Sequence, residues 1–127
     1  MRGFASNPEE VIELIGVPAE SWGEAGARRT PTSAPLKRSY VRHQLSFPPG
    51  APIFQMVPML LERLGGTTQL TRIVARVKPE FVELDLVLPV KDSPEQESGF
   101  ISTESIADLH QLGASLSFNF LHSAAEA

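Results

Sequence analysis

Five basic residues stand in one stretch of the chain that contains no acidic residue. Between residues 25 and 61 there is no Asp or Glu, and the cations are Arg28, Arg29, Lys37, Arg38 and Arg42. Because the whole chain carries a net charge of −4, the acidic excess must lie elsewhere. Arginine forks match the oxygens of phosphates and carboxylates. The stretch therefore predicts either a clamp for such an anion or a solvated loop whose cations meet the protein's own acids.

A second group of polar residues alternates along two predicted strands. Tyr40, Arg42 and Gln44 share one face of the first strand, and Glu83 and Asp85 share one face of the second. We expect these strands to be neighbours, with Arg42 beside Glu83 or Asp85. Two carboxylates at i and i+2 could support acid–base chemistry or hold a divalent cation. Cross-strand ion pairing on a wet sheet face is the simpler interpretation.

Motifs that would define an active site are missing from the sequence. The chain has no Cys, and its three His residues show neither H-x-x-x-H nor H-E-x-x-H spacing. No G-x-S-x-G, Walker loop or G-x-G-x-x-G is present. His43 falls on the apolar face of its strand and is predicted to be a core or rim residue. The sequence thus predicts no catalytic residue, no metal site and no cofactor, and it favours a protein that is not an enzyme.

Length and composition indicate one ordinary globular domain, residues 1–127. The chain has 42% hydrophobic and 20% charged residues. It shows no signal-peptide core and no apolar run near the roughly 20 residues that span a bilayer. We therefore expect a soluble cytoplasmic protein without a membrane partner. The mild net charge and the few aromatic residues among the cations argue against nucleic acid.

The periodicity of apolar residues predicts the order of the elements. A short strand in the first few residues and a helix up to Gly16 are followed by a long irregular loop over 18–38. We then expect a strand over 39–47 and a helix over 51–64, although this helix could instead begin at Pro58. For residues 67–78 we expect a helix, with a hairpin as the alternative. A strand over 80–90, a helix over 102–112 and a strand over 114–121 follow. Residues 123–127 are predicted to be a frayed tail.

The two ends of the chain have similar sequences. Each has an apolar residue (Phe4, Phe100), a Ser as predicted N-cap (Ser6, Ser102), a short amphipathic helix and a Gly stop. We therefore predict an α+β fold with two β-α-β units, ferredoxin-like or pseudo-duplicated, joined by a helical middle, with a mixed or antiparallel sheet. In the last strand, Phe118 and Phe120 are predicted to face the core.

The same end sequences resemble a bacterial family. The run from Asn7 to Val11 that closes with Leu14-Ile15-Gly16-Val17-Pro18, and the stretch from Gly99 to Ile106 with Leu112-Gly113-Ala114, resemble the opening and closing signatures of the family catalogued as Domain of Unknown Function 4279. Tyr40 stands where the family typically has Trp. The resemblance implies the fold, a bacterial or phage setting, and a role as an immunity or adaptor-like binding protein.

These observations give three hypotheses for function. The first is a non-enzymatic protein that binds a protein partner through the basic loop and the polar sheet face, with candidate residues Arg28, Arg29, Arg38, Tyr40, Arg42, Gln44, Glu83 and Asp85. The second is a domain, or an enzyme, that binds an anionic small molecule or nucleotide with the same cations. The third is a homodimer formed through Met56 and Met59 or through an unpaired strand edge.

Overall fold

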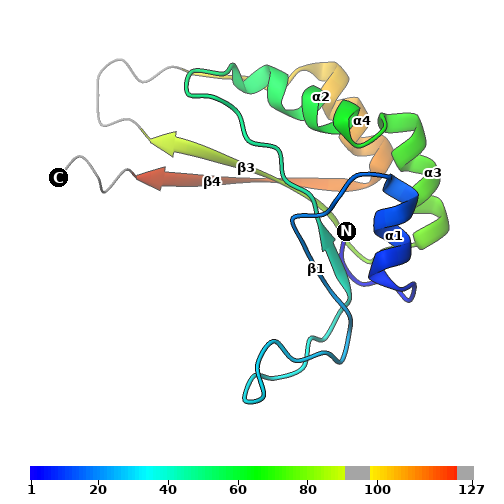
Figure 1. The fold of residues 1–127 in the computed structure, drawn as a ribbon. Helices are drawn as coiled ribbons and strands as arrows, with labels where there is room; N and C mark the ends of the chain where they lie inside the picture. Colours follow the sequence, from blue (N-terminus) through cyan, green and yellow to red (C-terminus); the bar gives the residue numbers. More distant parts are fainter. Residues whose placement is uncertain (91–97, 123–127) are drawn as a thin grey trace.

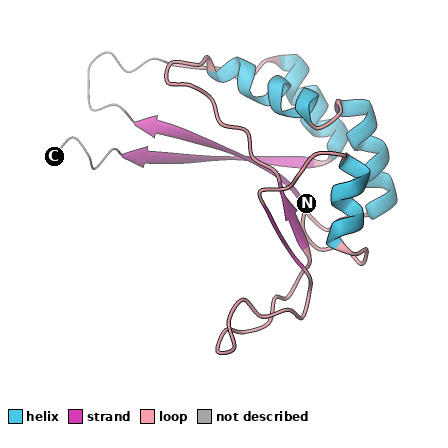
Figure 2. Cartoon of the chain, viewed as in Figure 1, coloured by secondary structure: helices cyan, strands magenta, loops and turns pink. Residues whose placement is uncertain are grey.

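The computed structural model of the chain describes residues 1–90 and 98–122. In these residues the element order is α1 (Pro8–Ile15), β1 (Ser21–Gly23), β2 (Tyr40–Arg42), α2 (Ile53–Arg63), α3 (Thr67–Val77), β3 (Val82–Val90), α4 (Thr103–Leu112) and β4 (Ala114–His122) (Figure 1). The helices gather on one side of the strands, and the segment between β1 and β2 projects away from them (Figure 2). The predicted α+β class is confirmed. The predicted tail at 123–127 lies outside the described residues.

The first three residues join two small sheets. β1 pairs antiparallel with β2, and β3 pairs parallel with β4. Arg2 forms antiparallel bridges to both Tyr40 and Phe81. On one side, the N–H of Gly3 donates to the Ser39 carbonyl at 2.8 Å, and on the other the N–H of Arg2 donates to the Phe81 carbonyl at 2.9 Å. Residues 1–3 therefore act as a short central strand between β2 and β3.

Several predicted strands differ from the observed ones. The strand predicted over 39–47 is limited to Tyr40–Arg42, because only these residues have partners, β1 on one side and Arg2 on the other. The predicted irregular loop 18–38 contains β1. β3, α4 and β4 form one β-α-β unit with parallel strands. The pairing of Arg2 with its neighbours is antiparallel, so the predicted N-terminal β-α-β unit and the ferredoxin-like arrangement are not confirmed.

Local signals place the helices close to their predicted bounds. Ser102 caps α4 as predicted, with its hydroxyl accepting from the Ser105 N–H at 3.2 Å. Asn7, and not Ser6, caps α1, because its side chain accepts from the Glu9 N–H. The helical alternative for residues 67–78 is confirmed by α3. Pro58 lies inside α2, which begins at Ile53, so the alternative start at Pro58 is wrong.

Two hydrophobic clusters share α3. The larger one packs α2, α3 and α4 on the inner face of β3, with Val57, Leu70, Leu86 and Leu109 among its buried members. The smaller one packs α1 on β2, and its members are Phe4, Val11, Ile15, Val41, Ile73 and Val77. Since Leu70 belongs to the first cluster and Ile73 and Val77 to the second, α3 couples the two sheets through their apolar faces.

Gly3 is required where the N-terminal segment passes β3. Its φ is +79°, and a Cβ added there would lie 2.8 Å from the Cβ of Glu80. Such a conformation costs an L-residue about 1–2 kcal/mol, before any clash is counted. The close approach permits the hydrogen bond from the Glu80 N–H to the Gly3 carbonyl, 2.8 Å long.

We predict that Gly3→Ala lowers the free energy of unfolding by about 2–4 kcal/mol, since strain and overpacking add. Gly26→Ala is the matched control, because Gly26 also has positive φ, +89°, but nothing lies within 4 Å of its added Cβ. The control should lose only about 1–2 kcal/mol. Urea unfolding measures both, and equal losses would contradict the close packing at Gly3.

Candidate functional site

The candidate site is the sheet face that the helices leave open. Tyr40, Arg2 and Phe81 are neighbours across the strands, because Arg2 bridges the other two. Val41, the residue after Tyr40, points to the opposite face and is buried in the smaller cluster. Alternation along the strands therefore sends Tyr40, Arg2 and Phe81 outward together. The projecting segment 24–38 emerges from the end of β1 beside this face (Figure 1).

Two arginines lie over the exposed ring of Phe81. The guanidinium carbon of Arg2 is 4.4 Å from the ring centroid, and that of Arg38 is 5.3 Å from it. Arg2 also forms an ion pair with Glu83 at 2.8 Å, and Arg38 forms one with Glu80 at 2.9 Å. Both arginines are thus held from two directions, by the π face of the ring and by a carboxylate.

A third arginine lies near Tyr40. The guanidinium carbon of Arg29 is 6.0 Å from the Tyr40 ring centroid, and its Nη2 donates to the hydroxyl oxygen at 3.4 Å. Gly23 on β1 makes room for this ring, because an added Cβ would lie 2.7 Å from the Tyr40 Cε1. The same Cβ would lie 2.6 Å from Leu36, which closes the base of the projecting segment. The basic segment is therefore attached to the sheet by apolar contact at Gly23.

The predicted site residues fall into separate groups. Arg29, Arg38 and Tyr40 belong to the arginine–aromatic face. Arg28 instead donates to the carbonyl of Ser33 within its own loop, and Arg42 donates to Gln44 two residues away. The predicted contact of Arg42 with Glu83 or Asp85 is wrong. Glu83 pairs with Arg2, and Asp85 accepts from the Ser117 hydroxyl at 2.9 Å, because residues 1–3 separate β2 from β3.

The ion pairs of this face add little to stability. The side chains of Arg2 and Glu83 are 48% and 49% exposed, and those of Arg38 and Glu80 are similarly open. Such exposed pairs typically contribute about 0.2–1 kcal/mol and weaken with salt. They fix the direction of the guanidinium groups, yet a stronger acidic surface could displace the carboxylates. The face is therefore ordered and accessible at once.

Sequence reasoning missed three residues of this face: Arg2, Phe81 and Glu80. Arg2 lies 81 positions before its partner Glu83, and no local pattern connects them. Phe81 did carry a signal, since its place in the predicted alternation puts it on the same face as Glu83 and Asp85. The Met1 amino group also lies here and donates to the Val41 carbonyl at 3.0 Å. Burial lowers the pKa of this amine, while the Glu83 carboxylate opposes the shift.

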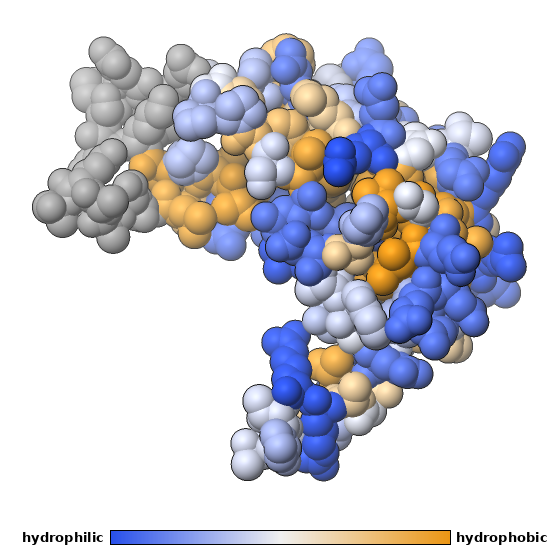
Figure 3. Space-filling model, in the orientation of Figure 1, coloured by the Kyte–Doolittle hydropathy of each residue, from blue (hydrophilic) through white to orange (hydrophobic). Residues whose placement is uncertain are grey.

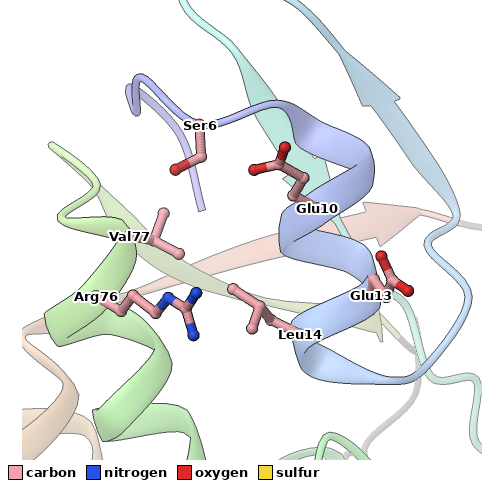
Figure 4. Close-up of a pocket in the computed structure, with 6 residues that line it drawn as sticks. All are labelled: Ser6, Glu10, Glu13, Leu14, Arg76 and Val77. Carbon is pink, nitrogen blue, oxygen red and sulfur yellow. The ribbon is translucent and has the colours of Figure 1, made fainter.

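Two shallow hollows share part of their lining: the smaller lies between α1 and α3, and the larger lies between the N-terminal segment, the end of α3 and the base of the projecting segment. The smaller, about 280 Å³, is lined by Glu10, Glu13 and Arg76 (Figure 4). The larger, about 520 Å³, has four cations, Lys37, Arg38, Arg76 and Lys78, and one acid, Glu80. Arg76 and Ser6 line both. Since Glu80 is paired with Arg38, the larger hollow has a marked excess of positive charge.

Within residues 1–90 and 98–122, no three His, Asp or Glu side chains lie close enough together to hold a metal ion. His43 is half-buried, and its Nε2 lies 2.9 Å from the Val17 carbonyl, which fits the predicted rim position. No helix in the described part of the chain is both long and apolar enough to cross a bilayer.

Comparison with protein-family models, with curated proteins and with solved structures gives no match for this chain.

Proposed function

We propose that the chain is a non-enzymatic binding protein that engages a protein partner through the open sheet face. The observation that carries the proposal is the group of three arginines that lie over two aromatic rings, Arg2 and Arg38 over Phe81 and Arg29 near Tyr40. Arginine and aromatic residues are enriched in the few residues that provide most of the energy of protein interfaces.

The arrangement also lowers the entropic cost of binding. The aromatic rings are carried by β2 and by the residue before β3, and the arginines are held by those rings and by Glu80 and Glu83. Long side chains that are already oriented lose less rotamer freedom when a partner docks. The basic residues 28, 29, 37 and 38, from a stretch that contains no acidic residue, add positive charge beside the rings and would steer an acidic partner surface toward the face.

We further propose a family, a source and a cellular location for the chain. Membership of the family catalogued as Domain of Unknown Function 4279, with its two-unit ferredoxin-like fold, is supported by the end sequences alone. An immunity or adaptor-like role and a bacterial or phage source follow from that membership. Cytoplasmic location is supported by the sequence, and the partner-binding proposal depends on none of these.

The test is affinity capture from nuclease-treated lysate of the source organism, followed by measurement of Kd for the protein captured in stoichiometric amount. Arg29→Glu/Arg38→Glu should weaken binding by at least about tenfold, because it reverses two charges at the centre of the face. The wild-type complex should also weaken as salt rises.

Arg63→Glu/Arg72→Glu is the control, since it makes the same charge change on exposed positions of α2 and α3. This variant should retain the partner with a Kd within about twofold of wild type. Loss of binding in the control, or full binding in the face variant at an unchanged melting temperature, would refute the proposal.

The larger hollow favours a second candidate function, the binding of an anionic small molecule. Lys37, Arg38, Arg76 and Lys78 converge on one concave surface, and Ser6 and Ser39 add hydroxyls to its lining. Like charges gathered in a hollow raise the local concentration of anions. This site differs from the predicted one in two ways. Three predicted cations, Arg28, Arg29 and Arg42, do not line the hollow. Two cations at the C-terminal end of α3, Arg76 and Lys78, do line it.

Calorimetric titration with pyrophosphate at fixed ionic strength tests this second candidate. Wild type should bind, and Arg76→Gln/Lys78→Gln should weaken binding by at least about tenfold, since two charge-assisted contacts are lost. Arg63→Gln/Arg72→Gln, outside the hollow, should not. Equal weakening in both variants would show general charge screening and would reject the site.

A further inference from the structure

The β3–β4 ribbon extends past the helical layer, and β4 is its edge strand. β4 pairs with β3 over nine residues, and no other strand in the described residues pairs with its outer edge (Figure 1). Parallel strands are usually buried within larger sheets, whereas beyond Phe81, where Arg2 pairs, no third strand of the described residues pairs with this ribbon. The backbone groups along the outer edge of β4 are therefore available to another strand.

Large apolar side chains lie along β4 near this edge. Phe118 and Phe120, predicted to lie in the core, are 50% and 61% exposed. Their register partners Leu86 and Leu88 are buried, because the larger cluster covers β3 and reaches β4 only at Ala114 and Leu116. The two rings are stacked with centroids 6.4 Å apart. Figure 3 shows apolar surface over this part of the ribbon.

The edge also lacks the features that keep natural edge strands apart. Residues 114–121 contain no Lys, Arg, Asp, Glu or Pro. Monomeric proteins commonly protect an edge with charges, proline or a bulge. A long, uncharged edge with exposed phenylalanines is consequently suited to pairing.

The sequence of β4 is self-complementary about Phe118. Apolar residues stand two positions to either side, Leu116 and Phe120, and small polar residues stand one position to either side, Ser117 and Asn119. In an antiparallel pair of two copies, Phe118 would face its own equivalent, Leu116 would face Phe120, and Ser117 would face Asn119. No charge would meet its own copy near the twofold axis.

We propose that β4 pairs antiparallel with β4 of a second copy of this chain, in the register centred on Phe118. The two ribbons then form one four-stranded sheet with both helical layers on the same face. Phe118 and Phe120 of each copy become covered by the other copy. The arginine–aromatic face, carried by Arg2, Tyr40 and Phe81, lies across β3 from β4 and on the sheet face that the helices leave open, so each copy keeps it accessible.

Sedimentation equilibrium of the full chain tests the dimer. The mass should rise with concentration from 13.8 kDa toward twice that value. Phe118→Lys should raise the dimer Kd at least about tenfold, because it places two like charges on the twofold axis. Met59→Lys, at a residue 47% exposed on α2, is the control and should leave Kd unchanged. A monomer at all concentrations, or a dimer weakened only by Met59→Lys, would overturn the proposal.

The register has its own test, because the chain contains no Cys. Mild oxidation of Phe118→Cys should produce a disulfide-linked dimer, since directly opposed residues have Cβ atoms about 4.5–5.5 Å apart. Met59→Cys should remain unlinked. If the chain is a dimer and Phe118→Cys does not cross-link, this register is wrong. If the chain is a monomer and β4 captures a different protein, the second copy is not the partner of this edge. Arg29→Glu/Arg38→Glu should leave the dimer intact, so the partner-binding proposal can fail separately.

Discussion

The structure depends on three residues that lie between strands distant in sequence. Residues 1–3 form backbone hydrogen bonds to Ser39 and Val41 on one side and to Glu80 and Phe81 on the other. Without them β1–β2 and β3–β4 would be separate two-stranded sheets, each marginal by itself. The same pairing explains the residue types found here. Arg2 points outward over Phe81, and Gly3, which has no side chain, permits the close approach to Glu80.

The insertion of residues 1–3 between β2 and β3 determines where the three proposed binding surfaces lie. The helices cover one face of the joined strands, which leaves the arginine–aromatic group on the other. The hollow lined by Lys37, Arg38, Arg76 and Lys78 forms where the N-terminal segment, the projecting segment and the end of α3 meet. The outer edge of β4 is separated from residues 1–3 by β3. A second copy would therefore contact other residues than a partner or an anion, whereas the partner face and the hollow share Arg38.

The elements that were predicted correctly from the sequence are those that local interactions determine. Amphipathic periodicity and capping located α3 and α4, and strict alternation located β3 and β4. The structure brings Arg29, Arg38 and Tyr40 together on one face, whereas the predicted contact of Arg42 with Glu83 or Asp85 is not formed. That error has one physical cause, the insertion of Arg2, whose pairing spans the chain from end to end. The exposure of Phe118 and Phe120 was missed because alternation predicts which face a residue takes, and the extent of the covering layer is a tertiary property.

The most direct test of this account is native-state amide hydrogen exchange measured residue by residue by NMR. The N–H groups of Arg2 and Gly3 are hydrogen-bonded to Phe81 and Ser39. If they hold the two sheets together, both amides should exchange as slowly as those of the buried helical residues Ile73 and Leu109, at the rate set by global unfolding. Exchange of Arg2 and Gly3 at the rate of an unstructured terminus, with Ile73 and Leu109 still protected, would contradict the account.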